Sequence, residues 1–548
     1  MKKRENADIP HAVDSLPDIG SALSIALLAV VILFAFIVYS PALKLGFYGD
    51  DFHYLPTPSI QSVSDLPDAF AYSLKRAPRV ISHGIYFVAG RAMFDLNHGA
   101  WHVSNFVLYA IAVYILYCFL FAVLRDRLAS LAGAGIFALS GILFHPLTWV
   151  TGVGELIAAA FAFCGFLLYV KAVRHFIETG KHRVWLEIAA LALLAFSLLS
   201  KETMLPVFLV LVLIDLFMLG RVSLAGYAAF LMAVFGTFLT MNKFAALQEY
   251  HSYSVSFNPI KILGGLLAYF YDTVIAVGGQ YWIIDRVGMR GDPGILEDFI
   301  SYATNNPLHA TGIVLPASVL GIFVVLFTIF KGKPGFRHAT FEKSLLPPLF
   351  GWIAWVSMLF PALLTPGHHY AYYLTVPLGL LMISIAPFVA TGLRNPRSRI
   401  ITVIALVIYI AWFPVNTSLA FKYSSSANGA VRTLEFIGQM KSMYPEMKPG
   451  TMVILDKVDR KFDWAINHGN AIEIYYPGTI SYSFFNFVEA VKNRPDVALE
   501  HDGDVLFFRE DNGKWSDVTG EMIPELKEII ENRSIPNRDF ADSSVPDQ

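Results

Sequence analysis

The segment GFYGDDFHYLP places two adjacent carboxylates, Asp50 and Asp51, shortly after the apolar run 21–40. A carboxylate in a partly desolvated loop can reach the raised pKa that a general base needs. Adjacent carboxylates are also suitable ligands for Mg²⁺ or Mn²⁺. Taken alone, the pair is equally well explained as solvated loop acids or as a helix N-cap. Its meaning therefore depends on which other polar residues the surrounding elements place on the same side.

The composition indicates a membrane protein. The 548 residues are 55% hydrophobic and only 15% charged, with a mean hydropathy of +0.53, whereas soluble proteins are about 25% charged. We expect a polytopic α-helical fold. The formal net charge of -2 indicates no nucleic-acid partner. Cys118 and Cys164 both lie in apolar runs, which is typical of buried core residues rather than of a disulfide or a metal site.

The hydropathy pattern predicts about eleven transmembrane helices. The first, 21–40, is longer than the apolar core of about 7–15 residues in a signal peptide, and no clear cleavage site follows it, so we expect an uncleaved span. The other expected spans are 101–124, 129–145, 151–170, 185–200, 203–220, 223–241, 308–330, 345–363, 371–391 and 399–417.

The basic residues predict the orientation, because short cytoplasmic loops collect Lys and Arg. They place the N-terminal segment 1–20 in the cytoplasm and loops 41–100 and 242–307 outside. Segment 262–284 is apolar but carries Asp272, and we expect it to be a re-entrant or surface-lying helix. Segment 79–95 is predicted to be an amphipathic helix on the outer surface. The basic groups are Lys2/Lys3/Arg4, Arg125/Arg127, Lys171/Arg174/Lys181/Arg183, Arg221, Lys331/Lys333/Arg337 and Arg394/Arg397/Arg399.

The composition changes near residue 420. Residues 21–419 are expected to form the membrane domain, and 420–548 a small extracytoplasmic α/β domain. Short strand-like runs at 451–458, 471–476 and 505–508 alternate with Gly, Pro and Asp, and helices are expected near 483–492 and 522–531. No internal repeat is visible.

The predicted topology gathers the polar residues that interrupt apolar sequence on the outer face. Ionisable residues at membrane boundaries are costly and are usually functional or paired, so a one-sided group is more informative than any single member. Separately, each has a structural explanation, such as an interfacial ion pair or a capped interfacial histidine. The group comprises Arg79, His102, Asn105, His145, Glu155, Lys201, Glu202, Asp285, His368 and His369.

The order and spacing of several short motifs resemble the GT-C superfamily of membrane glycosyltransferases. They are most similar to bacterial relatives of the protein O-mannosyltransferases that carry tetratricopeptide repeats. The resemblance covers about the first 220 residues and continues more faintly to Asp285. The R-P-L element of the family is altered to Pro78-Arg79-Val80, the later R-Y-x-Y-x-P element reads HHYAYYLTVP, and no repeat array follows the last span. The motifs are FYGDDFHYL, RAPRVISHGIYF, WHVSNFVLYA, GILFHPLTWVTGVGELIAAAFAF and LLSKETMLPVFLVLVLIDL.

The resemblance implies a GT-C-like fold and an enzyme of the bacterial inner membrane. Such enzymes transfer a sugar from a polyprenyl-phosphate donor to an acceptor hydroxyl on the extracytoplasmic face, and we expect inversion at the sugar carbon. Asp50 or Asp51 would be the base. The cationic candidates for the lipid phosphate are Arg79, Lys201, His368 and His369.

Several alternatives stay open from the sequence. The acceptor can be a protein, a lipid or a glycan, and the missing repeats favour the last two. A divalent cation at the acidic pair is open, whereas no glycine fingerprint indicates a nucleotide donor. The rival functions are a transporter or flippase of lipid-linked or small substrates and a non-catalytic scaffold.

Overall fold

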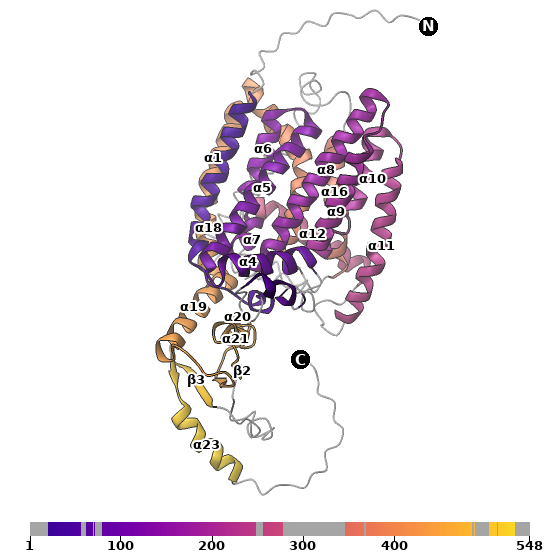
Figure 1. The fold of residues 1–548 in the computed structure, drawn as a ribbon. Coiled ribbons are helices and arrows are strands. Elements are labelled where there is room, and N and C mark those ends of the chain that lie inside the picture. Colours follow the sequence, from indigo (N-terminus) through magenta and orange to yellow (C-terminus); the bar gives the residue numbers. More distant parts are fainter. Residues whose placement is uncertain are drawn as a thin grey trace, which may run out of the picture. The chain divides into compact units, whose positions relative to one another are not determined.

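The computed structural model describes residues 20–55, 62–69, 71, 79–247, 256–277, 346–365, 369–484, 487, 504–511 and 513–531. The chain forms two compact units. We call them the helical unit, within residues 1–45 and 60–428, and the sheet unit, within residues 46–59 and 429–548. Figure 1 shows the helices of the helical unit lying side by side.

Six helices in the described part of the helical unit are long and apolar enough to cross a membrane. They contain α1 (Ser21–Tyr39), α5 (His98–Leu124), α8 (Val153–Thr179), α10 (Val207–Leu219), α17 (Thr375–Arg394) and α18 (Pro396–Tyr423). A helix of about 20 apolar residues covers the hydrocarbon core while satisfying its own backbone. These helices therefore support the expectation of a polytopic helical membrane protein.

The remaining expected spans differ in form. Residues 129–145 fall in α6 (Arg127–Ala138) and α7 (Phe144–Thr148), which belong to a helix pair bent by 46°. With that pair counted as one span, the described part has up to seven. Segment 308–330 lies outside the described residues, so the count of eleven stays a prediction. The other expected spans coincide with the helices α9 (Val184–Ser200), α11 (Leu224–Leu247) and α16 (Leu346–Leu363).

Two segments that were expected to be surface-lying or re-entrant helices are also helical in the described residues. Segment 79–95 forms a turn of π-helix, η3 (Val80–Ile85), followed by α4 (Tyr86–Phe94). The segment around Asp272 forms one helix, α12 (Pro259–Val277), which packs against α16. Asp272 is fully buried on its packed face, while Leu263 and Leu267 on the same helix are exposed. This one-sided burial fixes which face of α12 joins the bundle.

Basic residues gather at one end of the helical unit. Arg394, at the end of α17, forms a two-bond ion pair with Asp126 at distances of 2.5 and 2.8 Å, and Asp126 caps α6. Arg125 follows α5 and pairs with Glu178 near the end of α8. Glu155 lies in the first turn of the same helix, and 27 residues of α-helix extend about 40 Å. The ends of α8 are therefore about a membrane thickness apart.

The sheet unit is a four-stranded sheet in the order β2-β1-β3-β4. Strands β2 and β3 pair parallel to β1, and β4 pairs antiparallel to β3. The strands are β1 (Met452–Asp456), β2 (Ile480–Ser483), β3 (Val505–Asp511) and β4 (Lys514–Asp517). The helices are α2 (Asp50–Tyr54), α19 (Ser425–Met443), α20 (Arg460–Ala465), α21 (Asn470–Tyr475) and α23 (Thr519–Glu531), with the first four residues of α19 in the helical unit.

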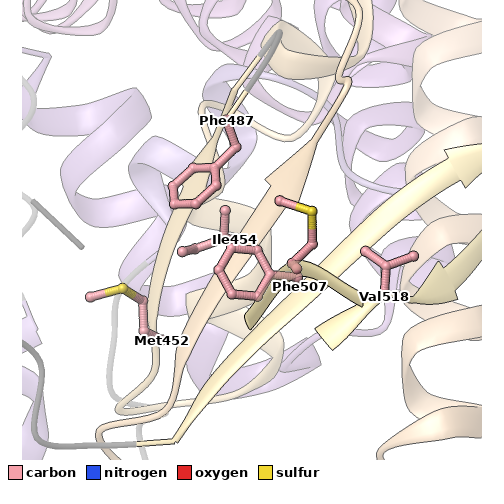
Figure 2. Close-up of a cluster of buried hydrophobic side chains, with 6 residues drawn as sticks. Met452, Ile454, Phe487, Phe507 and Val518 are labelled. Carbon is pink, nitrogen blue, oxygen red and sulfur yellow. The ribbon is translucent and has the colours of Figure 1, made fainter. Parts of the chain in front are cut away.

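The core of the sheet unit covers both faces of β1, as expected for a parallel strand. On one face a cluster of apolar side chains includes Ile454, Phe487 and Phe507 (Figure 2). On the other face the rings of Phe436 and Phe462 pack against Trp515 in tilted arrangements. All five strand residues of β1 are buried, which is why the run TMVILDKV reads as nearly continuous apolar sequence.

The structure corrects three expectations for this region. Run 471–476 is not a strand but the helix α21, because two isoleucines around Glu473 imitate a period of two in a segment too short to show a helical period. The boundary expected at 420 falls at Gly429, inside α19. The outer loop 41–100 is divided, since residues 46–59 fold with the sheet unit. Of the expected helices, 522–531 is confirmed within α23, and 483–492 lies mostly outside the described residues.

Candidate functional site

A buried ion pair joins Lys201 to Glu155 in the helical unit. The Lys201 Nζ lies 2.9 Å from Glu155 Oε1, and the two side chains are 8% and 2% exposed. Lys201 occupies the extended residue that ends α9, and Ser82 Oγ donates to the carbonyl of the preceding Ser200 at 2.6 Å. The break between α9 and α10 thus directs an ammonium group toward the first turn of α8.

A second ion pair meets the first at this break. Arg79 donates to both carboxylate oxygens of Glu202, from Nε at 2.6 Å and from Nη2 at 2.5 Å. Such a two-bond pair is geometrically specific. Because Lys201 and Glu202 are neighbours in the chain, the two ion pairs are adjacent in space, and each cation is compensated by its own carboxylate.

Tyrosine rings line the other side of Lys201. Its Nζ lies 5.2 Å from the ring centre of Tyr372 and 5.5 Å from that of Tyr373, both in the short 3-10 helix η9 (Ala371–Leu374). These are cation–π distances. The half-buried ring of His145 lies 5.9 Å from the ring of Tyr372. His145 was among the predicted site residues, whereas the tyrosines were not, and their only signal was the repeated aromatic run after His369.

A third pair joins His369 to Asp272, an acid that was not among the predicted site residues. His369 Nε2 lies 2.5 Å from Asp272 Oδ2, and the Asp272 side chain is completely buried. The Tyr269 ring packs on the imidazole, with ring centres 4.1 Å apart. An acid inside an apolar helix is costly unless it is paired, and this cost was the available signal. Because α12 packs against η9, the pair lies in the same region as Tyr372.

Together these side chains form what we call the polar cluster, which the helical unit assembles from segments far apart in the sequence. The bend between α6 and α7, the break between α9 and α10, and the turn η9 all interrupt helices here. The backbone therefore departs from regular helix where the charges are buried. The polar cluster comprises Arg79, Glu155, Lys201, Glu202, Asp272 and His369.

His102 and Asn105 serve the backbone of the bent segment. Asn105 Nδ2 donates to the carbonyl of Pro146 at 3.1 Å, and its Oδ1 accepts from Tyr86 OH at 2.7 Å. His102 Nδ1 lies 3.2 Å from the carbonyl of Leu147. Both side chains are buried, so the structure gives these two predicted site residues a positioning role next to the polar cluster.

The acidic pair belongs to the sheet unit. Asp51 is fully buried, and its Oδ2 accepts from the Tyr48 N–H at 3.0 Å, so this carboxylate holds the turn that begins α2. Asp50 is half-buried at the first position of α2. The preceding Gly49 has a φ of +55° and donates to the carbonyl of Ala465 at 2.8 Å. The structure thus separates two acids that the sequence left equivalent.

Two predicted site residues, Asp285 and His368, lie outside the described residues. Among the residues that are described, no group of three or more His, Cys, Asp and Glu side chains is placed to hold a metal ion. Asp51 Oδ2 accepts a hydrogen bond from the Tyr48 N–H. The cation expected at Asp50 and Asp51 stays a prediction.

No protein-family model matches this chain, and no curated protein matches it closely enough to indicate a relative.

Proposed function

We propose that the protein is a membrane glycosyltransferase that moves a sugar from a polyprenyl-phosphate donor to an acceptor hydroxyl. The supporting observation is the polar cluster, in which a buried ammonium and an imidazole lie at one end of an apolar helix bundle. A polyprenyl phosphate suits this position, because its chain stays in the bilayer while its phosphate needs cationic hydrogen-bond donors near the helix ends. A GT-C-like architecture is part of the proposal.

Lys201 is the proposed principal ligand of the lipid phosphate. An ammonium carries three N–H donors, and its ion pair with Glu155 uses one of them. The other two can donate to phosphate oxygens without breaking the pair. His369 supplies a second donor, and its contact with Asp272 keeps the ring oriented. These contacts would stabilise the charge that develops on the leaving phosphate.

Asp50 is the proposed base. The acceptor oxygen forms a bond to the anomeric carbon as the bond from that carbon to the phosphate oxygen breaks, so a single displacement inverts the carbon. The acceptor proton passes to the Asp50 carboxylate, and the electron pair leaves with the lipid phosphate. Asp51 is committed to the Tyr48 N–H and is therefore assigned to positioning Asp50.

The proposed setting is the bacterial inner membrane. The ion pairs of Arg125 and Arg394 lie at the end of the helical unit opposite Glu155, and short loops rich in Lys and Arg usually face the cytoplasm. In this proposal the N-terminus is cytoplasmic and the polar cluster lies at the extracytoplasmic surface. Membrane lipids and a protein, lipid or glycan acceptor are the proposed partners, and the sugar stays open.

The test is sugar transfer by membranes that contain the full chain. Polyprenyl-phosphate mannose and glucose, each labelled in the sugar, are supplied, and label is followed into protein, lipid and glycan fractions. Lys201→Ala should lower transfer by at least about a hundredfold, as expected for loss of a charge-stabilising donor. Lys171→Ala, an exposed lysine near the other end of α8, should leave transfer unchanged. Equal activity of the two variants would remove Lys201 from the mechanism.

A flippase is the second candidate, and the bend of 46° within the α6–α7 pair favours it, since transporters place substrates at interrupted helices. Proteoliposomes with a fluorescent polyprenyl phosphate distinguish the two functions. A flippase moves the intact lipid between leaflets, whereas a transferase consumes the donor and releases the lipid phosphate.

A further inference from the structure

The sheet unit presents a large aromatic side chain beside Asp50. A Cβ atom on Gly49 would lie 3.3 Å from Trp464 Nε1, so the indole packs directly against the residue before Asp50. The described residues 46–55 also contact α21, through the rings of Phe52 and Tyr475. The indole and the acidic turn are therefore one local structure within the sheet unit.

Trp464 is 43% exposed, although the other indole described in this unit, that of Trp515, is 6% exposed and packs in the core. His468 lies next to Trp464, with ring centres 6.4 Å apart, and its side chain is 66% exposed. Its Nδ1 contacts Asp463 Oδ2 at 2.7 Å, which fixes the ring. An ordered aromatic surface thus lies beside a half-buried carboxylate.

The backbone that presents His468 is in an unusual conformation. Asn467 and His468 both adopt left-handed φ values, 51° and 55°. Most residues other than glycine avoid this region, although asparagine and histidine adopt it more often than others. His468 is therefore presented by a turn between α20 and α21.

We propose that Trp464, Asp50 and His468 form the acceptor-binding surface and that the acceptor is a carbohydrate. A pyranose ring offers an apolar C–H face that packs on an indole, and hydroxyls that donate to a carboxylate and pair with an imidazole. A peptide is more commonly bound along an open sheet edge or a helix groove, whereas Trp464 lies on a six-residue helix. This inference rests on the proposed function, because it takes the bound carbohydrate to be the sugar acceptor whose hydroxyl Asp50 deprotonates.

The test measures binding without any donor. The full chain in nanodiscs is mixed with maltose, cellobiose or mannobiose, or with a heptapeptide rich in Ser and Thr, and contacts are read by saturation-transfer NMR. At least one disaccharide should give a signal, and Trp464→Ala should weaken its binding at least about tenfold. Trp464→Phe should retain part of the binding. Trp185→Ala, which removes an exposed indole of α9, should change nothing.

Thermal unfolding of each variant shows whether the fold is retained, and Trp464→Phe still tests the surface if the alanine variant unfolds. The proposal is overturned if no disaccharide binds, if only the peptide binds, or if binding survives Trp464→Ala in the folded protein. Disaccharide binding through Trp464 in a protein that transfers no sugar would refute the proposed function alone. Transfer that is unaffected by Trp464→Ala would refute the acceptor surface alone.

Discussion

Replacing Glu155 by Gln should destabilise the helical unit strongly, because Lys201 would remain buried without its counter-ion. Its ammonium lies 2.9 Å from the carboxylate and the side chain is 8% exposed. Breaking a buried pair from one side costs about 3–5 kcal/mol. The rings of Tyr372 and Tyr373, at 5.2 and 5.5 Å, contact the ammonium in both proteins and do not change this difference. We therefore expect a loss of about 3–5 kcal/mol.

Removing both charges distinguishes the effect of the ion pair on stability from its role in sugar transfer. In Glu155→Met/Lys201→Met no buried charge is left uncompensated, and apolar side chains of similar volume fill the site. Such replacements of buried pairs are neutral or stabilising by about 1–4 kcal/mol. The double variant should therefore be at least as stable as the unchanged protein and yet inactive in sugar transfer. Arg125→Ala/Glu178→Ala is the matched control, since both side chains of that pair are 60% exposed and solvent screens their interaction.

Thermal unfolding in detergent, followed by a dye that reacts with thiols, measures these differences. Cys118 in α5 and Cys164 in α8 become reactive when the bundle opens. The single variant should unfold well below the control, and the double variant should not. A double variant as unstable as Glu155→Gln would refute the reasoning, because the loss would then come from packing rather than from an uncompensated charge.

Three further outcomes are expected. Asp272→Asn should lower sugar transfer about tenfold through kcat, because His369 loses the carboxylate that orients it; unchanged kcat would exclude this role. Gly49→Ala should cost about 1–2 kcal/mol and displace the acidic turn, since φ is +55° and the added Cβ meets the indole at 3.3 Å; proteolysis of the sheet unit measures it. The hydrogen bond to Asp463 raises the pKa of His468. Burial acts to raise the pKa of Asp463, but the hydrogen bonds from His468 and a serine hydroxyl outweigh burial and lower it. The stability that this pair contributes should therefore be complete between pH 3.8 and pH 6.5, the ordinary pKa values of the two groups. It should decline as the pH rises through the raised pKa of His468, and also as the pH falls through the lowered pKa of Asp463. The measurement is protease resistance as a function of pH, and an identical pH profile in His468→Gln would contradict this.

Long apolar helices were the most predictable part of the fold. A run such as 101–124 has one physical solution in a bilayer, and α5 begins within a few residues of the predicted start. The sheet unit was harder, because α21 has only six residues and its alternating side chains also suit a strand. Membership of residues 46–59 in the sheet unit depends on contacts between segments more than 400 residues apart, which no local pattern records.

The sequence indicated which ionisable residues interrupt apolar segments, but it did not indicate which of them form ion pairs with each other. Lys201 and Glu202 are neighbours and suggested a pair with each other, whereas their partners are Glu155 and Arg79. Asp272 was visible as an acid in an apolar segment, yet its partner His369 lies 97 residues away. The hydrogen bond from the Tyr48 N–H to Asp51 and the complete burial of Asp51 were also not predictable, because the sequence does not encode them locally.

Transfer of labelled sugar by an Asp50→Asn variant tests the central claim most directly. The unchanged protein in nanodiscs should convert a polyprenyl-phosphate sugar to product, and Asp50→Asn should reduce the rate by about 10²–10⁴-fold while donor binding is retained. Asp65→Asn, an acid that caps a short helical turn of the helical unit, should transfer normally. Transfer by Asp50→Asn at the rate of the unchanged protein, or no transfer from any polyprenyl-phosphate sugar, would contradict the account.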